Sequence, residues 1–142
     1  MNSMMRILAA VACAAVLTTA CSKPATDQAA PPVVGVRVTG MDLGRSLAAD
    51  KAIADKTEAF RPADMIYLSV ETDGTSPKTT VAAHWTFQDG QVVKEQSETI
   101  APAGKARTEF HIEKPGGWPA GKYAVKVSLD GTAAGGKDFV VK

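Results

Sequence analysis

Few side chains in this sequence have the chemistry of a reactive or metal-binding group. Among 142 residues there are two histidines, His84 and His111, and two cysteines, Cys13 and Cys21. Both cysteines lie within the first 21 residues, which excludes a disulfide framework or a four-cysteine zinc site in the rest of the chain. The two histidines fall on the outward phase of separate predicted strands. We therefore expect solvated histidines, with no metal site, no catalytic site and no cofactor.

One segment comes close to a phosphate-binding loop. Residues 131–138, GTAAGGKD, place Gly131, Gly136 and Lys137 as that motif requires. The last position is Asp138, whose carboxylate would face phosphate, where the motif needs a hydroxyl. The motif also leads from a strand into a helix, whereas here a valine-rich predicted strand lies on either side. We therefore predict a plain hairpin connection.

The composition bounds the function classes. The chain carries 16 basic and 15 acidic residues, for a formal net charge of +1, and has no basic stripe of the kind that binds nucleic acid. Hydrophobic residues make up 45% of the chain, which is enough for a folded core. The length favours one domain.

The first 20 residues have the pattern of a signal peptide. Arg6 precedes an apolar run over residues 7–20, and a short positive start before such a run is typical of secretory signals. The run is shorter than the ~20 residues of a membrane-spanning helix. A buried helix of the mature domain is the alternative, but no polar face interrupts the run.

The end of this run, Leu17-Thr18-Thr19-Ala20-Cys21, resembles the lipobox of bacterial lipoproteins. The resemblance implies cleavage before Cys21 and acylation of that cysteine, and Ser22 after it implies transfer to the outer membrane, with the domain on the periplasmic side. We expect a signal peptide over 1–20, a lipidated cysteine with a proline-containing flexible tether over 21–33, and a folded domain over 34–142.

The rest of the sequence alternates mostly with period two, which predicts seven strands. Asp89-Gly90 is a strong hairpin signal, and the polar segment after it is predicted as an edge strand. The predicted strands are 33–41, 65–72, 80–88, 91–100, 106–114, 122–131 and 137–142.

These strands predict an all-β antiparallel sandwich, because parallel strands need long crossover connections. Only residues 46–60, rich in alanine and charge, could form a helix, with Ser46 as its cap. A short helix near 46–56 and an irregular loop both stay open. The charges of alternating sign over 45–64 favour a solvated face, with a partner dock as the alternative.

Two aromatic residues indicate an immunoglobulin-like sandwich. Trp85 points inward in the third predicted strand, and Tyr123 follows Gly121-Lys122 in a manner that resembles the tyrosine corner of these domains. The two core cysteine positions of antibody domains are Val125 and Leu68 here. The stretch 117–123, GWPAGKY, is similar to a recurring ending of periplasmic immunoglobulin-like lipoproteins. This resemblance covers residues 34–142 and implies a fold but no enzymatic activity.

We therefore expect a non-enzymatic interaction module, anchored to the membrane by lipid, that binds another cell-envelope protein. It would use the edge strand over 91–99 or a loop around Trp118 and Pro119, with Tyr67 as a weaker contact. The alternative for Trp118 is that it folds back over Tyr123. A small-ligand or glycan-binding lipoprotein and a structural envelope spacer are the alternative functions.

Overall fold

The computed structural model describes residues 35–142. The predicted signal peptide, Cys21 and the tether lie outside the described residues. Within residues 35–142 every regular element is a strand. The eight strands are β1 (Arg37–Gly44), β2 (Ala59–Phe60), β3 (Ile66–Asp73), β4 (Thr79–Phe87), β5 (Gln91–Ile100), β6 (Ala106–Ile112), β7 (Gly121–Leu129) and β8 (Thr132–Val141).

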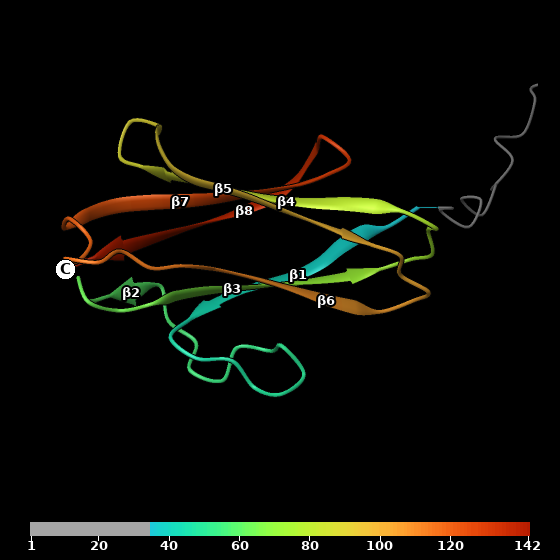
Figure 1. Cartoon of the computed structure of the whole chain (residues 1–142), viewed down its shortest axis with the longest axis horizontal. Coiled ribbons are helices and arrows are strands. Elements are labelled where there is room, and N and C mark those ends of the chain that lie inside the picture. Colours follow the sequence, from blue (N-terminus) through green and yellow to red (C-terminus); the bar gives the residue numbers. More distant parts are fainter. Residues whose placement is uncertain (1–34) are drawn as a thin grey trace, which may run out of the picture.

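The strands form two sheets packed face to face (Figure 1). One sheet has the order β1-β3-β6, and the other has the order β2-β8-β7-β4-β5. All pairings are antiparallel except that of β2 with β8. The chain is therefore an immunoglobulin-like β-sandwich, which confirms the predicted fold class.

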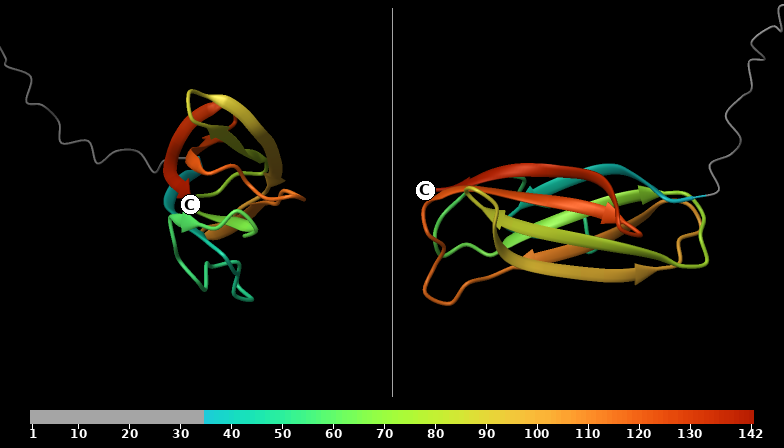
Figure 2. Two further views of the ribbon diagram at one scale, coloured as in Figure 1. Left: turned by 90° about the vertical axis from the view of Figure 1, so that its left-hand side faces the viewer. Right: turned by 90° about the horizontal axis from the view of Figure 1, so that it is seen from above.

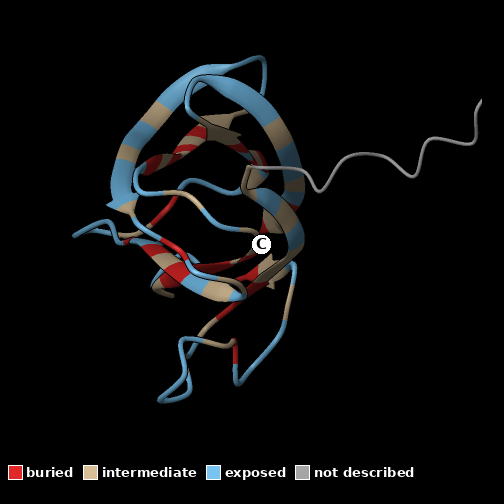
Figure 3. Ribbon diagram, turned by 90° about the vertical axis from the view of Figure 1, so that its right-hand side faces the viewer, coloured by how far each residue is buried: buried red, intermediate tan, exposed pale blue. Residues whose placement is uncertain are grey.

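The predicted alternation places the core as expected. Side chains at every second position of β3 and β4 are buried between the sheets, and buried residues (red) alternate with more exposed ones along strands of the sandwich (Figure 3). Trp85 is fully buried, packs edge-on against Phe139 and donates its Nε1–H to Gln96 Oε1 at 3.2 Å. The other large side chains that are fully buried are Phe60, Ile66, Leu68, Val70, Thr72, Val81, Thr108, Ile112, Val125 and Val127.

Two strands have other bounds than the sequence predicts: β1 lies a few residues further along the chain than the predicted strand 33–41, and β8 begins earlier than the predicted strand 137–142. A bulge between Val38 and Gly40 resets the alternation of β1, so that the strand runs to Gly44 and places Leu43 in the core. β8 begins at Thr132 because Asp130 and Gly131, with φ of 48° and 83°, form a tight turn directly after β7. The segment 131–138 is thus a hairpin turn and a strand, as expected, and not the start of a helix.

The alternative of a short helix near 46–56 is wrong. Residues 45–58 form an irregular excursion on the outer side of the three-stranded sheet (Figure 1). Leu47 and Ile53 face each other across an isolated bridge, and Lys51 has a positive φ of 64°, which a helix does not allow. Ile53 is 6% exposed, so burial of this side chain determines the path of the loop more than its alanine content does.

The sandwich is elongated, and different chain termini and connections lie at its two ends (Figure 2). The first described residues lie at one end, and the C-terminus lies at the other (Figure 1). The end with the C-terminus also carries the β4–β5 turn and the connection from β6 to β7. We call this the distal end, because it is the end remote from Gly35.

Candidate functional site

Trp118 belongs to the connection between β6 and β7 at the distal end. Gly116 and Gly117 both have positive φ, of 90° and 88°, and turn the chain so that the indole points back onto the sandwich. The Trp118 backbone N–H donates to the Pro62 carbonyl at 2.7 Å, and the indole Nε1–H donates to the Asp64 carbonyl at 3.1 Å. The residue is only 6% exposed, so Trp118 is a buried cover over the end of the core and not an exposed anchor.

Tyr123 lies beneath this cover. Its hydroxyl donates to the Pro119 carbonyl at 2.8 Å, which is the tyrosine corner that the sequence predicts. The ring stacks on Phe139 at 5.3 Å between centroids and meets Trp118 edge-on at 6.1 Å. Burial raises the pKa of the Tyr123 hydroxyl, so this group stays protonated and acts as a structural donor.

An open cleft of about 380 Å³ lies beside these aromatic rings at the distal end. Its floor is aromatic, and its rim carries charged side chains from the start of β5 and from the segment after β6. Val92 is 55% exposed and is the one large hydrophobic residue at the surface within residues 35–142. The cleft is lined by Phe87, Gln91, Val92, Val93, Lys94, Glu113, Lys114, Trp118, Pro119 and Tyr123.

Two of the predicted contact residues, Trp118 and Pro119, line this cleft. Trp118 contributes to the floor and Pro119 is exposed at the rim. Sequence reasoning named the edge strand over 91–99, with Lys94 on it, and the loop around Trp118 as separate contacts, and it did not pick out Val92 or Lys114. The sequence signal for Val92 is that two successive valines, Val92 and Val93, begin a largely polar edge strand, whose alternation lets only one of them face the core.

Tyr67 is not part of this cleft. It lies on the outer face of β3, is half-buried, and its ring approaches that of His111 to 5.6 Å between centroids. His111 also contacts Glu109 at 2.7 Å. Tyr67 and Trp118 therefore do not form one surface patch through the cleft.

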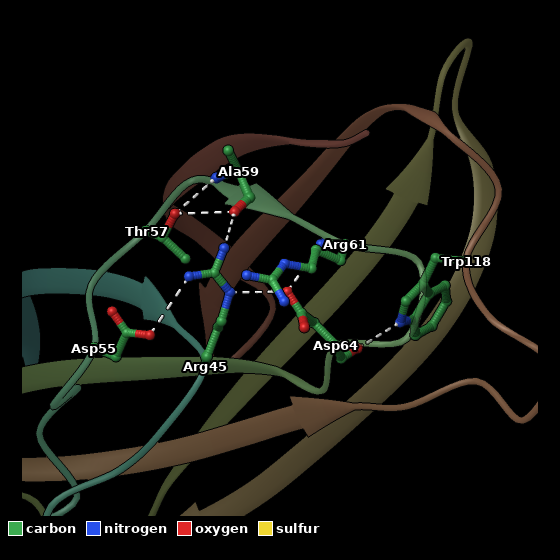
Figure 4. A network of polar contacts seen from close by, with 7 residues as sticks. All are labelled: Arg45, Asp55, Thr57, Ala59, Arg61, Asp64 and Trp118. Carbon is green, nitrogen blue, oxygen red and sulfur yellow. Dashed lines mark hydrogen bonds and ion pairs between the residues drawn. The ribbon is translucent and has the colours of Figure 1, made fainter.

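A network of hydrogen bonds and ion pairs around Arg45 and Asp64 connects the segments that meet at the distal end (Figure 4). The Arg45 guanidinium donates from Nε to Asp64 Oδ2 and from Nη2 to the Ala59 carbonyl, both at 2.8 Å. The same Asp64 oxygen accepts the Arg61 backbone N–H at 2.8 Å. Since the Asp64 carbonyl also accepts the indole of Trp118, the network joins the excursion after β1 to the cover over the core.

The charges of this network perturb one carboxyl group. The hydrogen bond from the Arg61 backbone N–H, together with the hydrogen bond and charge of Arg45, lowers the pKa of Asp64 below its usual value. The Arg45 guanidinium also lies 6.0 Å from the centroid of the Phe60 ring, within cation–π range. Much of the charge run over 45–64 is thus paired within the domain.

The histidines lie far from any shared site. His84 belongs to β4 and contacts Glu95 at 2.8 Å, whereas His111 belongs to β6 of the other sheet. Both positions agree with the predicted outward phase. Within residues 35–142 no group of three histidine, cysteine or acidic side chains is placed to hold a metal ion. That part of the chain also contains no helix long and apolar enough to cross a membrane.

β5 is an edge of the five-stranded sheet, as the sequence predicts. It pairs with β4 on one side, and no strand within residues 35–142 is hydrogen-bonded to its other side. The ladder with β4 has a bulge at Val93, because Trp85 pairs with Lys94 and Thr86 pairs with Val92. The strand therefore presents one row of backbone donors and acceptors at the surface.

A search of solved structures finds matches of low sequence identity, one of them with a TM-score above 0.5 among those described below. An immunoglobulin-like protein from Pseudomonas aeruginosa matches with a TM-score of 0.53 and 15% identity, over 76% of this chain and 97% of that chain. The CARDB domain of a Pyrococcus furiosus protein, in complex with di-metal ions, matches with a TM-score of 0.48 and 12% identity, over 76% of this chain and 88% of that chain. At 15% identity the likeness to the Pseudomonas aeruginosa protein shows the fold alone.

A third match is to part of a larger protein. The alkylpurine DNA glycosylase AlkC from Pseudomonas fluorescens, bound to DNA containing an abasic site analog, gives a TM-score of 0.49 and 18% identity over 75% of this chain. This chain spans only 30% of the glycosylase. No protein-family model matches the sequence, and a search of curated proteins gives no match.

Proposed function

We propose that this chain is a lipid-anchored interaction module on the periplasmic side of the outer membrane, and that it binds another cell-envelope protein without catalysing a reaction. The lipobox-like sequence that ends at Cys21 supports the anchor. Acyl chains contribute ~0.8 kcal/mol for each buried CH₂, so two or more chains give stable attachment.

The position of the distal cleft carries the proposal. An anchor on Cys21 attaches the chain on the side of Gly35, and the cleft lies at the opposite end of the sandwich. It combines an aromatic floor with the exposed Val92 and with Lys94 and Lys114 at the rim. An apolar centre within a charged rim is the usual anatomy of a protein-binding site.

The anchor and the cleft have separate tests. The Cys21→Ser variant should be absent from membranes in flotation experiments, while the wild-type protein floats with them. Flotation of the variant to the same extent as the wild type would contradict the lipid anchor.

The cleft is tested by a photo-crosslinking amino acid placed at Val92 of the membrane-anchored protein in cells. We expect one dominant adduct with another envelope protein, identified by mass spectrometry. A crosslinker at Lys126, exposed on β7, is the matched control and should not give that adduct. Equal capture from both positions, or capture of abundant neighbours only, would contradict the proposed site.

The size of the same cleft favours a second candidate function, the binding of a small ligand or glycan. Its volume of about 380 Å³ falls in the range of small-molecule sites, and Gln91, Glu113 and Lys114 offer polar groups around the aromatic floor. A thermal-shift panel of sugars, peptidoglycan fragments and metal ions tests this function. A rise in the unfolding temperature that Lys114→Ala abolishes would support it, and no shift across the panel would count against it.

A further inference from the structure

The middle of the exposed edge strand β5 has a charge sequence that complements itself. The segment Lys94-Glu95-Gln96-Ser97-Glu98 carries a positive charge near one end and a negative charge at the other. Lys94 and Glu98 are both exposed, and neither takes part in an ion pair within residues 35–142. Glu95, by contrast, is already paired with His84.

The register with β4 fixes which of these side chains share a face. Lys94, Gln96 and Glu98 pair with Trp85, Ala83 and Val81, which all point into the core. Paired residues of an antiparallel ladder lie on the same face of the sheet. Lys94, Gln96 and Glu98 therefore lie on the inner face, while Glu95 and Ser97 lie on the outer face.

A second copy of β5 can pair with this edge in antiparallel orientation about a two-fold axis. If the axis passes through Gln96, Lys94 lies opposite Glu98 of the second copy, and Glu98 lies opposite Lys94 of the second copy. Glu95 then lies opposite Ser97. This register places two unlike-charge pairs on the inner face and no like charges opposite one another.

The neighbouring registers that keep the faces matched are less favourable. An axis through Glu95 sets Glu95 against itself, an axis through Lys94 sets Lys94 against itself, and an axis through Glu98 sets Glu98 against itself. An axis through Ser97 pairs no opposite charges. Registers centred between residues place inner side chains against outer ones. The charges thus select the register centred on Gln96 from among these alternatives.

We propose that two copies of this chain associate through β5, antiparallel and centred on Gln96, so that their five-stranded sheets become continuous. The free edge supplies the backbone hydrogen bonds, and the two Lys94–Glu98 pairs specify the partner and the register. The bulge at Val93 limits the regular ladder at one end. The proposal does not depend on the lipid anchor or on the partner of the distal cleft.

The test is the oligomeric state of the full-length protein, measured in detergent by sedimentation velocity over a range of protein concentrations. We expect a dimer for the wild type. Lys94→Glu and Glu98→Lys should each weaken dimerisation roughly tenfold or more, because two unlike-charge pairs are replaced by two like-charge pairs. The double variant Lys94→Glu/Glu98→Lys should restore the wild-type dimer.

Controls separate this contact from other causes of association. Lys126→Glu changes the same charge on β7, which is not at an edge, and should leave the dimer unchanged. Two copies that merely share a detergent micelle would not respond to the single charge reversals, and that result would overturn the proposal. A wild type that is monomeric at every concentration would overturn it too, as would a folded double variant that stays dissociated. Circular dichroism establishes that each variant is folded.

Discussion

The variant Trp118→Ala tests whether this residue stabilises the fold or contacts a binding partner. The side chain is 6% exposed, its Nε1–H is bonded to the Asp64 carbonyl, and its ring lies edge-on to Tyr123. Truncation of a buried tryptophan costs ~3–5 kcal/mol. The site borders an open cleft, so water can fill the space, and we expect the lower part of this range, about 3 kcal/mol.

The assay is equilibrium urea unfolding followed by tryptophan fluorescence. Because the chain has two tryptophans, the variant leaves Trp85 as the one reporter, at the centre of the core. With a slope of ~1–3 kcal/mol per molar urea, the midpoint should fall by roughly 1–3 M. Pro119→Ala is the matched control, since the exposed ring is lost while the carbonyl that accepts the Tyr123 hydroxyl remains, and its effect should stay within about 0.5 kcal/mol.

Trp118→Phe gives a further separation. It keeps an aromatic cover over Tyr123 but removes the indole donor, so the loss should be smaller than for alanine, with a hydrogen-bond contribution of ~0.5–1.5 kcal/mol. A Trp118→Ala variant that unfolds at the same urea concentration as the wild type would refute a stabilising role for this side chain. Lost crosslinking at the cleft by such a fully stable variant would instead make Trp118 a direct contact.

Three other predictions concern stability. Thr108→Val should raise the free energy of unfolding, measured in urea, by about 1 kcal/mol, because the buried Oγ1 of Thr108 has no hydrogen-bond partner among residues 35–142. The pKa of Asp64 is lowered in the folded protein, so its ionised form adds to the free energy of unfolding in full above the unfolded pKa of ~3.9, and this stabilisation is lost as the pH falls through the folded pKa. Urea unfolding between neutral and acid pH should therefore show a steeper loss of stability for the wild type than for Asp64→Asn. Gly44→Ala should destabilise the domain by ~1–3 kcal/mol, since a Cβ there would lie 2.1 Å from the Asp55 carbonyl oxygen and 2.2 Å from Ile53 Cγ2; an unchanged thermal midpoint would show that the excursion moves away freely.

Local alternation was sufficient to predict the strands whose one face is buried. In β3, β4, β6 and β7 every second residue enters the core, and a change of register by one residue would expose that whole set. The tyrosine corner was predictable for a similar reason, because its donor and acceptor lie only four residues apart.

Features that depend on long-range contacts were not predictable in this way. β2 has two residues and exists through its parallel pairing with β8, about 80 residues away in the sequence. The Arg45–Asp64 contact joins residues that flank an irregular segment, and alternating charges there favoured a solvated face. No helix forms near 46–56, because the burial of Ile53 against Gly44 outweighs the weak helix preference of an alanine-rich segment.

The cleft and the edge strand illustrate where function can lie in such a domain. Burial in the core accounts for the aromatic residues Trp85, Trp118 and Tyr123. The presence of an aromatic side chain in this domain is therefore weak evidence for a binding site. Val92, Lys94 and Glu98 are different, because each is exposed on a free edge and no packing requirement accounts for a valine or for charges in this order. Charges on an edge strand oppose indiscriminate pairing, and the same charges in a self-complementary order permit one register. We therefore expect substitutions in β5 to alter association while leaving the unfolding free energy almost unchanged, and substitutions of the buried aromatic residues to do the reverse.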